Sequence, residues 1–367
     1  MKHRKEIFMA NQASLSKKDT EFREFALHAD MWRVVLYVCA PLALYQSLTQ
    51  IFKIFDSMMA AHISANSVSA VAYLSQINLM LSALGGGLAV GASIKVSEAY
   101  GAGDYMLVKK RVSTLFALCG ILGGGILLVL VPFSSQVLRL AKTPESFIQE
   151  GSRYFILELF GMVISFFNNV YIAIERARGN SKRILHLNLI VIAIKLSLTA
   201  LFVYVLHSGI NMIAVATIVS QSALLLSAVY NLNQKGNAFG FSLSSITMKR
   251  NVVAPMIGLS IPVIIEKTAF AFGKVVINSM STVYDALVVG ALGISNNIGG
   301  FTTSPQNGFQ EGGSAIISQN LGAGNAKRAL EAFKWVFVFC CLIGIVLMSI
   351  TMIFLKQVCW MFAGEDE

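Results

Sequence analysis

The chain has 367 residues, of which 55% are hydrophobic and 13% are charged, and its mean hydropathy is +0.66. Soluble domains carry about a quarter charged residues, so this composition excludes a water-soluble enzyme and indicates a multi-pass membrane protein. The formal net charge of +10 comes from 29 Lys and Arg against 19 Asp and Glu. In a membrane protein, its meaning depends on where the basic residues lie relative to the spans.

Residues 1–33 are polar and have no apolar segment ahead of a cleavage site, so we expect no removable signal peptide. A helix needs about 20 apolar residues to cross the hydrocarbon core. Nine later stretches meet this length, namely 34–59, 68–99, 112–132, 152–174, 184–207, 211–232, 253–280, 286–320 and 332–356. Glycines and polar residues interrupt 68–99 and 286–320, which predicts tilted or kinked spans that line a polar space.

The basic residues are distributed unequally between the two sides of the predicted spans. If residue 1 is placed inside, 20 of the 29 Lys and Arg fall in inside segments, four fall outside and five lie within spans. Cytoplasmic loops carry the excess of Lys and Arg in membrane proteins. We therefore expect a cytoplasmic N-terminus, and the net charge needs no nucleic-acid partner.

An internal repeat appears when the chain is shifted by 221 residues against itself. The segment from Ser97 to Asp104 then falls on the segment from Ser318 to Asn325, and both contain Gly-Ala-Gly. Across 36–111 and 257–332, 14 of 76 positions are identical without a gap. Six spans separate the copies, which predicts a parallel repeat of the kind found in secondary transporters.

The repeat divides the chain into two unequal parts. We expect a cytoplasmic segment at 1–33, a first lobe of six helices at 34–232, a cytoplasmic linker at 233–252 and a partial second lobe of three helices at 253–367. A second lobe as long as the first would extend beyond residue 367. We therefore expect a truncated sequence that lacks three helices.

Five segments together resemble the multidrug and toxic compound extrusion (MATE) family of cation-coupled exporters. They are Ile54–Ala60, the two Gly-Ala-Gly turns, Glu175–Lys182 and Gly209–Thr217. The resemblance implies an all-α, two-lobe helical bundle of twelve transmembrane helices, of which this chain has about nine. It also implies efflux by alternating access against Na⁺ or H⁺.

Three residues of the first lobe are candidates for the ion-coupling site. Asp56 matches the acidic position of the family's first span, where the coupling cation binds; the alternative is a hydrated charge near the outer interface. Lys195 stands where the family usually has Asn, and Thr199 lies one turn away on the same helix face. The Lys195 ammonium replaces Na⁺, joins the coupling after losing its proton, or forms a structural ion pair with Asp56 or Glu158.

Four further ionisable residues within spans are candidates for the substrate cavity, since such groups usually face water or a partner. Lys53 and Lys274 are equivalent in the repeat. Two interpretations apply to both: the side chain snorkels to an interface, or it contacts substrate. Glu266 follows Pro262 in the seventh span, and Glu311 lies between Gly308 and Gly312 in the eighth. Lys95 and Glu98 are spaced as an ordinary helix pair.

The first functional hypothesis is an antiporter of the cell membrane that exports small amphipathic or xenobiotic compounds, coupled to H⁺ or Na⁺ influx. The second is a flippase for a lipid-linked precursor, which the lysines of the spans favour. The third is a non-transporting chain that needs a partner. We expect a monomer if a full-length chain exists, with a small-molecule substrate and the lipid bilayer as partners. We expect no enzyme activity, cofactor, metal site or nucleic acid.

Overall fold

The computed structural model describes residues 15–61, 65–140, 145–234, 237–281, 283–284 and 286–357. The helices are α2 Lys17–His28, α3 Met31–Ala61, α4 Ala65–Gly101, α5 Tyr105–Leu130, α6 Ser134–Leu140, α7 Glu145–Ala177, α8 Ser181–Ala200, α9 Asn211–Leu232, α10 Arg250–Ser281, α11 Ala286–Gly322 and α12 Ala326–Ile353. A π-helical turn, Leu201–Val205, extends α8, and a 3₁₀ turn, Leu243–Ser245, lies in the linker. The described residues contain no strand.

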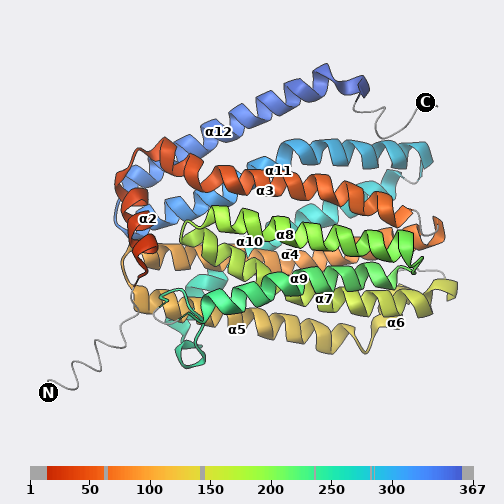
Figure 1. Cartoon of the computed structure of the whole chain (residues 1–367), viewed down its shortest axis with the longest axis horizontal. Coiled ribbons are helices and arrows are strands. Elements are labelled where there is room, and N and C mark those ends of the chain that lie inside the picture. Colours follow the sequence, from red (N-terminus) through yellow and green to blue (C-terminus); the bar gives the residue numbers. More distant parts are fainter. Residues whose placement is uncertain are drawn as a thin grey trace.

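All nine predicted spans correspond to long helices that run along the bundle (Figure 1). Eight of these, with α8 extended by its π-helical turn, are long and apolar enough to cross a membrane. The ninth, α11, is 37 residues long, and polar residues along it lower its hydropathy. The all-α polytopic fold is therefore confirmed.

Two helices were not predicted, and most of the others begin earlier than predicted, α5, α7 and α12 by six or seven residues. α2 and α6 lie in segments that the sequence pattern indicates as polar connections. α5 begins at Tyr105 and α12 at Ala326, because the basic residues at their starts are helical although they are not apolar. Apolar length marks where a helix crosses the membrane, and it does not mark where the helix starts.

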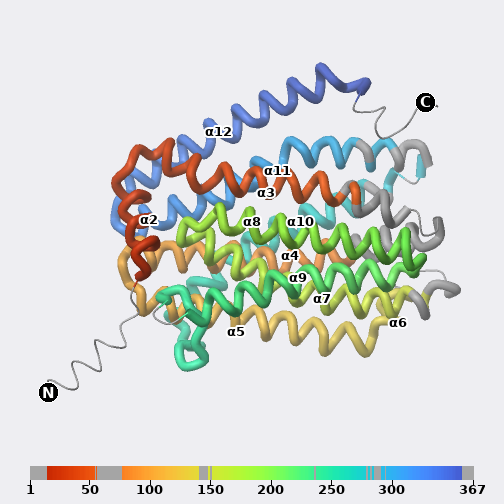
Figure 2. Tube along the Cα trace, in the orientation of Figure 1, coloured from red at the N-terminus to blue at the C-terminus, as the bar shows by residue number. Residues whose placement is uncertain are grey.

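The internal repeat is visible in the helices and in their packing. The pairs α3 and α10, α4 and α11, and α5 and α12 have lengths of 31 and 32, 37 and 37, and 26 and 28 residues. α3 packs along α11, and α4 packs along α10 (Figure 2). The first helix of each copy thus contacts the second helix of the other, as a two-fold relation requires.

The two parts of the bundle are called here the N-terminal group, α3–α9, and the C-terminal group, α10–α12. The main apolar core lies in the N-terminal group, where α4, α5, α7 and α9 meet around the buried side chains of Phe155, Phe166 and Tyr171. A second core joins the two groups and contains Val35, Cys39 and Ile316. By contrast, α12 contacts only α11 and α3 to any extent and diverges from the bundle (Figure 1).

Candidate functional site

The two helix groups are in close contact in the half of the bundle towards α2 and the linker; the end where these lie is called the α2 end (Figure 1). Glycines make this contact possible. A Cβ added to Gly87 in α4 would lie 2.8 Å from the Ile264 Cα, and one added to Gly308 in α11 would lie 2.6 Å from the Ala43 Cα. Gly87 and Gly308 are equivalent in the repeat, and so are Ala43 and Ile264. Each glycine therefore packs against the backbone of a helix in the other group, and the repeat relates the two contacts.

The same symmetry holds one turn closer to the α2 end. Gly91 of α4 lies against the backbone of Ser260 in α10, and Gly312 of α11 lies against Cys39 in α3. The Ser260 hydroxyl donates to the Leu88 carbonyl at 3.3 Å, across the two groups. Small residues let helices approach closely, and at these four glycines the two groups are in direct contact.

An ion pair adds a polar contact between the groups. The Arg176 guanidinium, at the end of α7, donates to the Glu311 carboxylate of α11. The Arg176 side chain is 3% exposed and that of Glu311 is 22% exposed. Close by, the Gln319 amide of α11 donates to the Ala177 carbonyl at 2.6 Å. Glu311, a predicted cavity residue, thus lies in an ion pair between the two groups.

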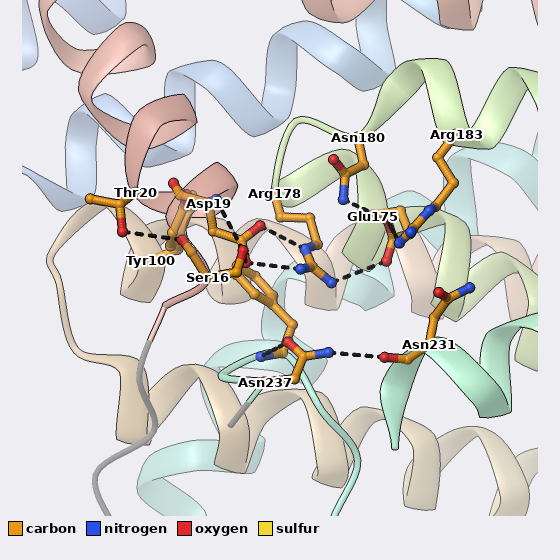
Figure 3. Close-up of polar contacts among 11 residues, drawn as sticks. Ser16, Asp19, Thr20, Tyr100, Glu175, Arg178, Asn180, Arg183, Asn231 and Asn237 are labelled. Carbon is orange, nitrogen blue, oxygen red and sulfur yellow. Dashed lines mark hydrogen bonds and ion pairs between the residues drawn. The ribbon is translucent and has the colours of Figure 1, made fainter. Parts of the chain in front are cut away.

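A second polar cluster surrounds the turn between α7 and α8 (Figure 3). The Glu175 carboxylate is fully buried and accepts from Arg178 at 3.3 Å and from the Asn180 amide at 2.8 Å. Arg183 lies 3.5 Å from its second oxygen. Burial alone would lower the pKa of the Arg178 guanidinium. The hydrogen bond to Asp19, with the negative charges of Glu175 and Asp19, outweighs burial and raises this pKa.

The predicted coupling residues Lys195 and Thr199 both lie on α8, at the far part of the helix from the α2 end. Thr199 is fully buried, and its hydroxyl has no hydrogen-bond partner among the described residues. The π-helical turn begins two residues later, and such turns are frequent at functional sites. The side chain of Asp56 lies outside the described residues, so the expected approach of Lys195 to Asp56 stays a prediction.

A further polar contact of the N-terminal group involves Glu158, one of the two carboxylates considered above as ion-pair partners of Lys195. The Asn78 amide of α4 donates to the Glu158 carboxylate of α7 at 2.9 Å. The Asn78 carbonyl oxygen is buried without a hydrogen-bond partner in the described part of the chain. Asn78 and Thr199 are two of five residues in the described part of the N-terminal group with a buried side-chain oxygen that has no hydrogen-bond partner; the others are Asn168, Ser181 and Asn211. Such oxygen atoms can accept from a proton donor or bind a cation.

Three lysines of the predicted cavity come from three different helices. Lys53 of α3 is exposed, and the positive charges of Lys195 on α8 and Lys274 on α10 both act on it. The Lys274 ammonium lies 5.0 Å from the centre of the Phe270 ring. Glu266, the remaining candidate, is exposed on α10. Lys95 and Glu98 form the expected pair within α4, at 2.5 Å.

The residues that close the α2 end were not predicted from the sequence. Arg176, Arg178 and Arg328 were counted among the basic residues of inside segments, and the first two also lie in the family-like segment Glu175–Lys182. No contact was predicted for any of the three, although each makes a specific hydrogen bond in the structure. Asp19 was not predicted either. Ser16 followed by Asp19 has the spacing of a helix N-cap, and this signal would have located α2. Among the described residues, no group of three or more His, Cys, Asp or Glu could hold a metal ion.

Membrane-length helices arranged as a parallel repeat, in two groups that pack against each other, are typical of a polytopic membrane transporter. The model of the MatE family matches residues 41–201 and 262–367, which together make up most of the chain. The chain belongs to the MatE family. Members of this family are transporters and not enzymes, which agrees with the expectation from the sequence.

Curated relatives are similar over most of the chain. The probable multidrug resistance protein YoeA of Bacillus subtilis is 22% identical over 345 residues, which are 92% of this chain and 74% of the relative. The probable multidrug resistance protein YpnP of the same organism is 27% identical over 290 residues, which are 78% of this chain and 64% of the relative. The chain thus spans between about two-thirds and three-quarters of these relatives.

Solved structures share the fold. One is a transporter of the MOP superfamily from Pyrococcus furiosus, described as having a binding pocket of reverse polarity. It superposes with a TM-score of 0.88 at 19% identity and covers 96% of this chain and 78% of its own. Another is the outward-facing conformation of a MATE family multidrug resistance transporter, with a TM-score of 0.86 at 19% identity, covering 95% and 77%.

Proposed function

We propose that this chain acts in a secondary-active exporter that moves small amphipathic or xenobiotic compounds out of the cell by alternating access, driven by influx of H⁺ or Na⁺. It lies in the cell membrane with residue 1 in the cytoplasm, as a monomer when the full-length chain exists. Its relatives YoeA and YpnP of Bacillus subtilis are named as probable multidrug resistance proteins. In this proposal the two lobes span residues 34–232 and 253–367.

The observation that carries this proposal is the symmetric closure of one end of the bundle. Gly87 and Gly91 on one side, and Gly308 and Gly312 on the other, hold the two groups together at the α2 end. The connections at this end carry most of the basic residues, so by the positive-inside rule it is the cytoplasmic end. A bundle closed at the cytoplasmic end is the outward-facing state of an alternating-access cycle.

The coupling site in this proposal is Asp56, with Lys195 and Thr199 beside it. The buried, unsatisfied hydroxyl of Thr199 supports this assignment, because an oxygen atom without a partner is costly unless a proton donor or cation satisfies it. A carboxylate that holds a proton or a cation in one state and releases it in the other couples the influx of this ion to the export of the compound. Lys195 either supplies a permanent ammonium in place of Na⁺ or exchanges its own proton.

The test is efflux from proteoliposomes loaded with a fluorescent cationic dye, under an imposed proton or sodium gradient. Asp56→Asn is expected to abolish gradient-driven efflux while the protein keeps its elution profile and melting temperature. Glu21→Gln is the matched control, because Glu21 is an exposed carboxylate of α2. Undiminished efflux in Asp56→Asn overturns the coupling role.

A second candidate function is a flippase for an anionic, lipid-linked precursor. Lys53, Lys195 and Lys274 favour it, because the positive charges of Lys195 and Lys274 both lie within electrostatic reach of Lys53. A phosphate group suits such a cluster better than an organic cation does. Transport of pyrophosphate-linked lipids between leaflets, without efflux of cationic dyes, supports the flippase. The opposite result supports the exporter.

A further inference from the structure

α2 is a short helix that lies across the α2 end of the bundle instead of along it (Figure 1). It begins at an N-cap in which the Ser16 hydroxyl accepts from the Asp19 backbone N–H at 3.2 Å. Its buried residues Asp19, Ala26 and Leu27 face the ends of the membrane helices. The helix therefore has an inner face built for contact with the rest of the chain.

The first half of α2 is bound to the N-terminal group (Figure 3). The Arg178 guanidinium donates to both oxygens of the Asp19 carboxylate, at 2.9 and 2.8 Å, and both side chains are buried. The Tyr100 hydroxyl donates to the Asp19 carbonyl. Arg23 donates to the Gly101 carbonyl at 2.8 Å and to the Tyr100 carbonyl at 3.3 Å. Paired, bidentate contacts of this kind are among the strongest polar contacts in proteins.

The second half of α2 is bound to the C-terminal group. The Arg328 guanidinium of α12 donates to the Ala29 carbonyl at 2.7 Å and to the Ala26 carbonyl at 3.4 Å. The Asn320 amide of α11 also lies 3.5 Å from the Ala26 carbonyl. These carbonyls belong to the last turn and C-cap of α2. A helix leaves its last carbonyls without partners and carries partial negative charge there, so Arg328 caps α2 from the other group.

The two attachments differ in kind. The N-terminal group holds α2 by a buried, bidentate ion pair and three further hydrogen bonds. The C-terminal group holds α2 through hydrogen bonds from the half-buried Arg328 and from Asn320 to backbone carbonyls, and through the apolar core that Ala26 shares with Ile316 of α11. Water can replace the caps of carbonyls at a helix end at small cost. It cannot replace the partner of a buried charge without a large cost.

We propose that α2 is a latch across the α2 end, which stays with the N-terminal group through Asp19 and Arg178 and is released from Arg328 when this end opens. The proposal rests on alternating access as the proposed function. It assigns α2 a role in stabilising the closed end, and it makes Arg328 a positioning residue for the conformational change.

The test is a set of three spin-label distances in the full chain reconstituted in lipid, with the native cysteines replaced. Labels at Lys17 of α2, Lys110 of α5 and Glu331 of α12 report on the latch, the N-terminal group and the C-terminal group, and all three positions are exposed. Distances are compared in the parent chain, in Arg328→Ala and in Lys327→Ala, the matched control at the exposed neighbouring position.

Arg328→Ala is expected to increase the open population at the α2 end about tenfold, because hydrogen bonds from a charged group are lost. The 110–331 and 17–331 distances then both gain a longer component, while the 17–110 distance is unchanged. Lys327→Ala leaves all three as in the parent chain. Arg328→Lys keeps the charge at the end of α2, so its open population is expected to lie between those of the parent chain and Arg328→Ala. This variant replaces Arg328→Ala in the test if Arg328→Ala does not fold.

Two results overturn the latch. In one, the 110–331 distance lengthens while the 17–331 distance does not, because α2 then follows the C-terminal group. In the other, Arg328→Ala and Arg328→Lys match Lys327→Ala in every distance. Neither result bears on dye efflux, so failure of the latch and failure of the proposed function are distinguished.

Discussion

Gly101 and Gly322, which are 221 residues apart, each lie against the backbone of the other's helix with no room for a Cβ. The Gly101 Cα faces Gln319 of α11, and the Gly322 Cα faces Glu98 of α4. Glu98 and Gln319 are themselves equivalent in the repeat. α4 and α11 therefore cross on the pseudo-two-fold axis of the molecule, at the α2 end. This crossing is where the two groups must separate if this end opens.

The first prediction concerns the crossing itself. Gly322→Ala is expected to push α4 and α11 apart and to destabilise the closed state by about 1–3 kcal/mol, the usual cost of overpacking. The measurement is the 110–331 spin-label distance, which should gain a longer component. Gly124→Ala is the control, because a Cβ on Gly124 of α5 would meet nothing within 4 Å. Identical distances in the two variants would contradict the tight crossing.

The second prediction concerns the ion pair between the groups. Glu311→Gln leaves the buried Arg176 guanidinium without its carboxylate, and breaking such a pair costs about 3–5 kcal/mol. The melting temperature of the purified protein should fall clearly. Glu21→Gln, at an exposed pair, should change it little. If Arg176→Gln in addition to Glu311→Gln restores none of the loss, the cost does not come from the uncompensated charge.

The third prediction separates backbone strain from contact with α2. Gly179 and Gly324 have almost the same positive φ, +78° and +77°, so Ala strains the backbone equally at both, by about 1–2 kcal/mol. A Cβ on Gly179 also collides with the Phe22 ring of α2, whereas one on Gly324 meets nothing within 4 Å. Gly179→Ala should therefore lower the melting temperature more than Gly324→Ala and expose α2 to proteolysis. Equal effects would show that Phe22 moves freely.

The fourth prediction concerns Lys195, which stands where the family resemblance leads us to expect Asn. If its ammonium takes the place of the coupling cation, Lys195→Asn opens the site to Na⁺. Efflux by the variant should then be stimulated about tenfold by a sodium gradient, the order of a typical coupling between sites. The parent chain should respond little to the same gradient. A variant that only loses stability, with no response to Na⁺, would indicate a structural ion pair instead.

The long helices and the repeat could be predicted because apolar length and glycine spacing are local properties of the sequence. Pro41 and Pro262, or Gly101 and Gly322, are equivalent positions in the amino-acid sequence itself. The contact of Arg176 with Glu311 could not be predicted, because 135 residues separate them and nothing in either segment names the other. α2 was missed for a different reason: its residues are mostly polar, and its partners come from four distant segments.

The coupling site could be predicted only in part, because spacing along one helix does not give contacts between helices. Lys195 and Thr199 were paired by helix spacing, and their position on α8 agrees with that spacing. The buried hydroxyl of Thr199 without a partner in the described part of the chain is a feature that sequence spacing does not predict. The relation of both residues to Asp56 stays a prediction, and the efflux assay of Asp56→Asn addresses it directly.

The most direct test of alternating access measures both ends of the bundle in the same sample. Lys110 and Glu331 are equivalent in the repeat at the α2 end, and Phe133 and Phe354 are equivalent at the opposite end. All four are exposed, and each pair takes two spin labels. When the ion gradient is reversed, alternating access predicts that the 110–331 distance lengthens while the 133–354 distance shortens. Changes of the same sign at both ends, or no change at either end, would contradict it.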